Sequence, residues 1–249
     1  MSAARRMLGL AAVLLLAGCR GESKPDPQLP ALPGVDAIDD SLSAIVREGD
    51  AARQAVPLLP GDASKGAAEP LVTIVEWSDF QCPHCGSFAQ MLDEVAANYP
   101  DDVRVVFRQY PLPMHPDAEL GARAAIAAGA QGRFWAMHDR LFAHRSAMGR
   151  DEVVAHARGL GLDVAAFEAA LDDPATAARV QADKRAGAEL GIRGTPSGFV
   201  NGIAFSGAPK PAALTEMIER ERALGRRLIE AGSTRAEVYA RIVKAAGGR

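Results

Sequence analysis

The chain has few cysteines, no excess of positive charge and no long apolar run. Three cysteines occur among its 249 residues, and the formal net charge at pH 7 is −3. Because the sequence has no concentrated basic patch, we expect no nucleic-acid partner. The apolar run from Met7 to Ala17 is shorter than the about 20 residues that a transmembrane helix needs. No internal repeat is present.

The chain also lacks a second pair of closely spaced cysteines. Cys82 and Cys85 are separated by two residues, and the third cysteine, Cys19, is far away. Zinc usually takes four ligands from two such pairs. No second ligand pair is provided by the histidines, which are His84, His115, His138, His144 and His156. The spacing therefore favours a redox pair over half of a zinc site.

The residues around this pair predict a strand, a turn and a helix. Leu71 to Trp77 is an apolar, β-rich run, and Ser87 to Ala97 has the apolar periodicity of a helix. Pro83 suits the first helical turn. At a helix N-terminus, unpaired N–H groups and the helix dipole favour the thiolate of Cys82, which is the nucleophilic form. A strand, a C-x-x-C sequence and a helix are the signature of thioredoxin-type redox proteins.

The start of the chain predicts export. Arg5 and Arg6 precede the short apolar run, which ends in Leu16-Ala17-Gly18-Cys19. This sequence resembles the lipobox of bacterial lipoproteins. The resemblance implies a signal peptide over residues 1–18, lipid on Cys19, and a periplasm-facing protein of the cell envelope that is lipid-anchored to a membrane. The alternatives are an ordinary signal peptide with a chance cysteine and a buried N-terminal helix.

Composition divides the rest of the chain. Residues 19–69 are rich in Pro, Gly, Ala, Asp and Ser and predict a flexible tether, with a short helix within 36–56. Residues 70–225 predict one domain, and 226–249 a helical extension. Within the domain we expect a second strand at 103–108, a helical block at about 117–190, a hairpin around Asn201-Gly202 and a last helix at 211–224.

This order of elements resembles the thioredoxin fold with an inserted helical subdomain, as in the DsbA-like thiol oxidases, and thus an α/β protein. Three motifs carry the resemblance: Cys82-Pro83-His84-Cys85, Phe134-Trp135-Ala136-Met137-His138 and Gly194-Thr195-Pro196-Ser197. It covers the region from about Leu71 to Leu224.

The resemblance assigns roles to several residues. Cys82 is expected to be the exposed nucleophile, Cys85 the buried resolving thiol, and His84 a donor to the Cys82 thiolate. Pro196 is expected to be the cis-proline beside the pair, and the backbone of Thr195 to meet the bound substrate. The well-studied periplasmic oxidases usually have Val in place of this Thr, so the substrate preference stays open.

Glu76 interrupts an apolar strand six residues before Cys82. A buried carboxylate is unfavourable unless it is paired or protonated. DsbA-like proteins have a glutamate at the matching position, so we expect Glu76 to accept a proton from Cys85 and to pair with Arg104 or Arg108. The alternative is an edge glutamate that faces solvent.

The predicted function is a monomeric thiol:disulfide oxidase that acts on reduced exported polypeptides and is reoxidised by a membrane protein. The resemblance implies no cofactor apart from the redox-active disulfide of Cys82 and Cys85. Two alternatives remain: a disulfide isomerase or reductase, and a metal-binding thioredoxin-like lipoprotein, against which the lack of Met or Cys clusters counts.

Overall fold

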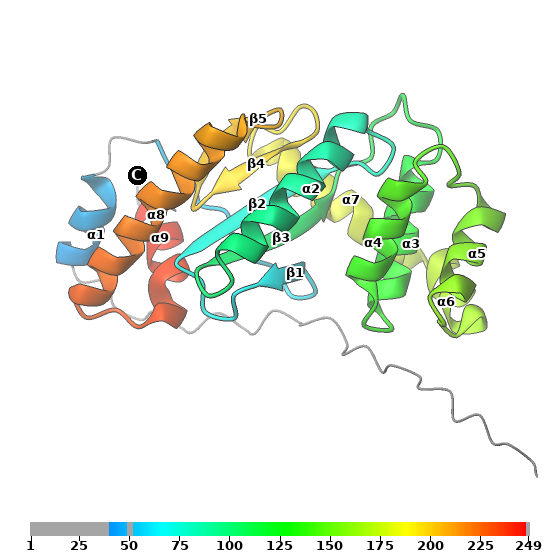
Figure 1. Cartoon of the computed structure of the whole chain (residues 1–249), viewed down its shortest axis with the longest axis horizontal. Helices are drawn as coiled ribbons and strands as arrows, with labels where there is room; N and C mark the ends of the chain where they lie inside the picture. Colours follow the sequence, from blue (N-terminus) through cyan, green and yellow to red (C-terminus); the bar gives the residue numbers. More distant parts are fainter. Residues whose placement is uncertain (1–39, 49–51, 248–249) are drawn as a thin grey trace, which may run out of the picture.

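The computed structural model describes residues 40–48 and 52–247 (Figure 1). The predicted signal peptide, the predicted lipid attachment site at Cys19 and the first part of the predicted tether lie outside the described residues.

A five-stranded mixed sheet forms the centre of the fold, in the order β1-β3-β2-β4-β5. β2 and β3 are parallel, and the other neighbours are antiparallel. Both central strands are buried along their whole length, so their apolar residues join the core and their polar residues, Glu76, Arg104 and Arg108 among them, are buried as well. The strands are β1 (Ala63–Gly66), β2 (Val72–Ser78), β3 (Val103–Gln109), β4 (Ser197–Val200) and β5 (Ile203–Ser206).

Helices cover the sheet and extend it at both ends (Figure 1). Five consecutive helices, α3 to α7, are inserted between β3 and β4, so the predicted α/β architecture with a helical insertion is confirmed. The helices are α1 (Asp40–Arg47), α2 (Pro83–Asn98), α3 (Ala118–Gly129), α4 (Phe134–Ala143), α5 (Arg150–Gly159), α6 (Val164–Asp172), α7 (Pro174–Glu189), α8 (Pro211–Glu230) and α9 (Val238–Gly247).

The two faces of the sheet bury different residues. α2 and α8 cover one face, where Ile74 and Phe107 pack with Phe88 and Ile218 in the main core. The other face carries a smaller apolar cluster. The alternation of side chains along β2 and β3 thus separates two interiors.

The chain just before β1 crosses this second face. In this segment, the strap (residues 52–62), Val56 is fully buried, and its carbonyl oxygen accepts a hydrogen bond from the Tyr239 hydroxyl at 2.6 Å. Arg53 forms a buried ion pair with Glu221 at 2.7 Å. The prediction of a flexible tether up to residue 69 is therefore wrong from residue 52 onward, because Val56 and the buried charges bind to the sheet and to the C-terminal helices.

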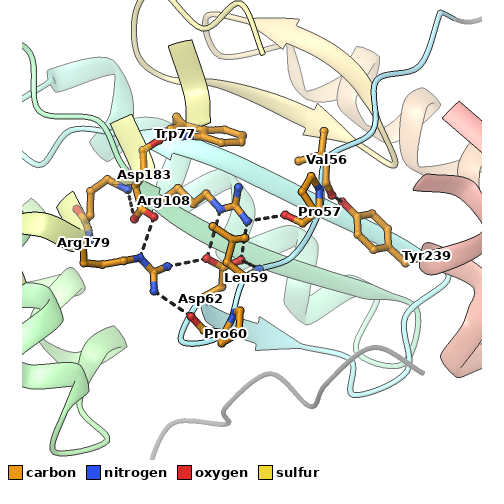
Figure 2. Close-up of polar contacts among 11 residues, drawn as sticks. Val56, Pro57, Leu59, Pro60, Asp62, Trp77, Arg108, Arg179, Asp183 and Tyr239 are labelled. Carbon is orange, nitrogen blue, oxygen red and sulfur yellow. Dashed lines mark hydrogen bonds and ion pairs between the residues drawn. The ribbon is translucent and has the colours of Figure 1, made fainter. Parts of the chain in front are cut away.

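Buried charges fasten the strap to the sheet and to the insertion (Figure 2). The carboxylate of Asp62 pairs with Arg108 of β3 at 2.7 Å and with Arg179 of α7 at 2.7 Å. Arg179 also pairs with Asp183 at 2.8 Å. A buried charge that loses its partner destabilises the fold strongly, so these groups hold their elements together as one unit.

The C-terminal region is part of the same body. α8 continues to Glu230, past the predicted end at Leu224, and so crosses the predicted start of a separate extension. Leu228, Val238 and Ile242 are fully buried in the main core. The predicted hairpin is confirmed, since Asn201 and Gly202 have φ of 46° and 85°.

We expect Asp62→Asn to lower the free energy of unfolding by about 3 kcal/mol, because Arg108 would remain buried without its anionic partner. Asp172→Asn removes an exposed partner of Arg150 and should lower the free energy of unfolding much less. Urea unfolding of the two variants checks this. Equal losses would mean that the buried cluster does not fasten the strap.

Candidate active site

Cys82 lies at the start of α2. It is the N-cap residue, Pro83 is the first residue of the helix, and no side chain caps this end. A turn built on Asp79 holds it there: the Asp79 carboxylate accepts hydrogen bonds from the backbone N–H groups of Gln81 at 2.7 Å and Leu112 at 2.8 Å. The predicted placement of Cys82 at a helix N-terminus is confirmed.

The loop before β4 covers Cys82. The Thr195–Pro196 peptide bond is cis, as predicted, and Cys82 Sγ lies 3.6 Å from the Thr195 carbonyl oxygen. Cys82 is only 4% exposed, so the prediction of an exposed nucleophile is wrong for this structure. The Thr195–Pro196 loop and the α2 N-terminus leave little of the residue open.

Cys85 lies one turn further into the helix and is fully buried. Burial raises the pKa of the Cys85 thiol to about 12, and the hydroxyls of Ser78 and Thr195 oppose this increase. The prediction of a buried second thiol is confirmed. A thiolate on Cys85 is therefore strongly disfavoured, and this sulfur takes up a proton when it leaves a disulfide.

Glu76 is buried on β2, and the Ser78 hydroxyl acts on both Glu76 and the Cys85 thiol. Glu76 is 1% exposed, which rules out the alternative of a solvent-facing edge residue. Burial raises the pKa of the Glu76 carboxyl to about 8, while the charge of Lys65 and the hydroxyl of Ser78 oppose the increase. A carboxyl with a pKa near neutral can both accept and donate a proton.

The predicted pairing of Glu76 with Arg104 or Arg108 is wrong. In the β2–β3 register Glu76 lies beside Phe107, whereas Arg108 lies beside Trp77 on the opposite face of the sheet. Arg104 donates to the carbonyl oxygen of Ala67 at 3.0 Å, and Arg108 binds Asp62. The two-residue period of a strand directs both arginines away from the redox pair.

Three residues near the pair were not predicted. Ser78 follows Glu76 on the same face of β2, and its hydroxyl lowers the pKa of both Glu76 and Cys85. Lys65 of β1 and Asp93 of α2 form an ion pair whose charges also act on Glu76. One carboxylate oxygen of Glu76 and the Ser78 hydroxyl are buried and have no conventional hydrogen-bond partner among the described residues.

The exposure of these groups increases from the buried thiol to the Lys65–Asp93 pair. Cys85 and Ser78 are buried, Lys65 has a side chain that is 19% exposed, and Asp93 has one that is 54% exposed. The alternation of the β2 sequence places Ser78 on the face of Glu76 and could have identified it. Nothing in the sequence around Lys65 predicts that it faces β3.

His84 lies inside the motif with an exposed side chain. It forms no hydrogen bond or ion pair with any residue in the described ranges 40–48 and 52–247. Its role as a donor to the Cys82 thiolate stays a prediction.

In the described part of the chain, no helix is long and apolar enough to cross a membrane. In the same part, no three His, Cys, Asp or Glu side chains gather in a group that could hold a metal ion.

The geometry of the redox pair agrees with comparisons to known proteins. A family model described as the DSBA-like thioredoxin domain matches residues 73–219. The chain belongs to this family. Its DsbA-like domain is a thiol:disulfide oxidoreductase domain with a thioredoxin fold.

Two solved structures resemble most of the domain. A thioredoxin-like oxidoreductase from Silicibacter pomeroyi is 27% identical, with a TM-score of 0.59 that covers 75% of this chain and 99% of that one. DsbA2 from Pseudomonas aeruginosa is 26% identical, with a TM-score of 0.57 over 66% of this chain and 96% of that one.

The curated relatives are larger proteins. The Na(+)/H(+) antiporter NhaA of Herminiimonas arsenicoxydans is 36% identical over 161 residues, which make up 65% of this chain and 26% of the antiporter. The chain therefore spans about a quarter of the length of the curated relatives that it matches.

We expect Glu76→Gln to change the pH dependence of stability. In the reduced wild type, the folded state keeps the Glu76 proton up to about pH 8, whereas the unfolded state loses it near the ordinary value of 4.5. The free energy of unfolding of the wild type should therefore fall relative to that of Glu76→Gln as the pH rises from about 4.5 to about 8. Above about pH 8 the difference between the two proteins should stay constant. Urea unfolding across this range measures it, with the exposed Glu94→Gln as control. A constant difference at all pH values would contradict the burial of an ionisable Glu76.

Proposed function

We propose that the protein is an oxidase that introduces disulfides into exported polypeptides through Cys82 and Cys85. The observation that carries this proposal is the placement of Cys82 at an uncapped helix N-terminus, in front of a fully buried Cys85. A helix N-terminus in general favours a thiolate over a thiol, and a stabilised thiolate favours the reduced state of such a pair. A disulfide whose reduced form is stabilised is a strong oxidant.

The proposed reaction is two successive disulfide exchanges. A substrate thiolate attacks Cys82 Sγ, the Cys82–Cys85 bond breaks, and Cys85 leaves and takes up a proton. A second substrate thiolate then attacks the substrate sulfur of the mixed disulfide, and Cys82 leaves as a thiolate. The substrate loses two electrons, which the pair receives. A membrane partner that accepts two electrons restores the disulfide, and no further cofactor takes part.

Glu76 is proposed to handle the proton of Cys85. Below about pH 8 its carboxyl is protonated, so it can supply a proton when Cys85 leaves the disulfide. During reoxidation its carboxylate takes the proton back. Ser78 lies close enough to influence both groups, and the Lys65–Asp93 pair marks the surface where the proton exchanges with solvent.

A reductase or isomerase is the alternative, and the potential of the pair separates them. DsbA has a potential of about −120 mV and thioredoxin about −270 mV. We expect this pair to equilibrate with glutathione near the oxidising value. A potential near that of thioredoxin would favour the reductase, and stoichiometric copper or zinc in the purified protein would favour a metal-binding role.

We expect Cys82→Ser to abolish the oxidation of a reduced model protein, because the attacked sulfur is lost. Cys85→Ser should instead accumulate mixed disulfides through Cys82, since the resolving thiol is missing. Non-reducing electrophoresis with mass spectrometry checks both variants. Mixed disulfides that form through Cys85 in Cys82→Ser would reverse the assigned roles.

The protein is further proposed to be a lipid-anchored monomer of the cell envelope, facing the periplasm. The sequence Leu16-Ala17-Gly18-Cys19 supports this placement. A lipid on Cys19 would hold the oxidase at the membrane, where its reoxidising partner lies.

We expect Cys19→Ser to release the protein from the membrane fraction and to leave its oxidation of a model substrate in solution unchanged, because Cys19 precedes the folded domain by more than 20 residues. Fractionation and the intact mass of the N-terminus check this. An unmodified Cys19 in the membrane-bound wild type would refute the lipid anchor.

A further inference from the structure

A pocket opens beside the N-terminus of α2, separate from the Thr195–Pro196 loop. It has a volume of about 440 Å³, and neither Thr195 nor Pro196 lines it. Three segments form its walls: the residues around the redox pair, the loop after β3, and the end of α4 with the loop that follows it. The lining residues are Gln81, Pro83, His115, Pro116, Phe142, Ala143, Arg145 and Ser146.

Gln81 holds these walls together. Its side-chain oxygen accepts the backbone N–H of Asp117 at 2.8 Å, and its side-chain nitrogen lies 3.5 Å from the carbonyl oxygen of Arg145. The ring of Phe142 packs on Phe80 with centroids 4.9 Å apart. The pocket is therefore a built part of the junction between the sheet and the helical insertion.

Arg145 is the positively charged side chain that lines this pocket. Its side chain is exposed, and it forms no hydrogen bond or ion pair within the described ranges 40–48 and 52–247. A Cβ atom on Gly86 would lie 3.8 Å from Arg145 Nη1, so the guanidinium lies over the first turn of α2. The positive end of the α2 dipole and the Arg145 charge thus meet at one place.

No carboxylate lines the pocket. Two acids contact its lining residues: Asp79 binds His115 Nδ1 at 2.8 Å and two backbone N–H groups, and Asp117 lies 3.4 Å from the side-chain nitrogen of Gln81. Neither acid forms an ion pair with Arg145, so an anionic group in the pocket would meet the Arg145 guanidinium beside the N-terminal turn of α2.

An exposed apolar side chain precedes one of the lining residues. Met114 directly precedes His115 and is 70% exposed, unusually high for a large hydrophobic side chain. Flexible, exposed methionines are typical of surfaces that bind varied polypeptides. A second pocket of about 380 Å³ shares Phe142, Ala143 and Arg145 and continues along α2. Two carboxylates line this second pocket: Asp93, which pairs with Lys65, and Asp139, which binds His138 Nδ1 at 2.8 Å.

We propose that this pocket binds the part of a polypeptide substrate that flanks its reacting cysteine, and that Arg145 selects segments with a carboxylate side chain there. The inference rests on the proposed oxidase function and names its substrate preference. Arg145 acts on binding and orientation, whereas the sulfur chemistry stays with Cys82 and Cys85.

The test uses the oxidised protein and a set of peptides with two cysteines. Each peptide carries Glu, Gln or Lys at one position near the reacting cysteine, and this position is varied on both sides of that cysteine. The rate of mixed-disulfide formation is measured by stopped flow. At one or more places we expect the Glu peptide to react about two- to five-fold faster than its Gln counterpart, as for an exposed ion pair. The preference should decrease with salt.

Variants separate the possible outcomes. Arg145→Gln should remove the preference for Glu, and Arg145→Glu should turn it into a preference for Lys. Arg158→Gln is the control, since it removes the same charge from an exposed side chain on α5 that lines neither pocket. Oxidation of all peptides at equal rates by wild type and Arg145→Gln would overturn the proposal and leave the oxidase function intact.

Two further results have distinct meanings. No peptide oxidation by the wild type would overturn the oxidase function itself. An effect of Arg145→Gln on reoxidation by the membrane partner alone, with unchanged peptide rates, would assign the pocket to that partner and overturn the substrate preference.

Discussion

Strand β2 has protein on both faces and a hydrogen-bonded neighbour on both edges. Because its side chains alternate between the two faces, it places the redox residues on one side of the sheet and the residues that contact the strap on the other. Glu76 and Ser78 face α2 and the buried thiol. Val75 and Trp77 face the strap and α7. A shift of the register by one residue would exchange these sets and place the carboxyl among the apolar side chains of the second face.

The second face explains how the redox face keeps its geometry. The strap crosses the sheet between β5 and β1, and its buried charges engage β3 and α7. Tyr239 of α9 binds the same segment. The family match covers residues 73–219, so the strap, β1 and α9 lie outside the matched region. They supply Lys65, which acts on Glu76, and they tie both ends of the described chain to the central strands.

The sequence predicts the local parts of the site well. The spacing of Cys82 and Cys85, the proline at the start of α2 and the interruption of an apolar strand by Glu76 are signals within a few residues. The cis bond before Pro196 followed from a family resemblance.

The partners of Glu76 were predicted wrongly for a different reason. The alternation of side chains along β3 can be read from the sequence, but which β3 residues lie on the face of Glu76 depends on the register between β2 and β3, two strands far apart in sequence. The strap was missed because Pro and Gly describe its backbone, while its placement depends on contacts with Arg108, Arg179 and Glu221.

Both edges of the sheet are short. β1 and β5 have four residues each, β1 carries a lysine and ends at a glycine with φ of 92°, and Arg53 pairs with the start of β5. Unpaired strand edges recruit other extended chains, and short, charged or interrupted edges suppress this recruitment. The proposed substrates are unfolded polypeptides, which present many such segments. The short, charged edges of this sheet therefore disfavour the addition of a strand from an unfolded polypeptide, and so disfavour aggregation with the proposed substrates.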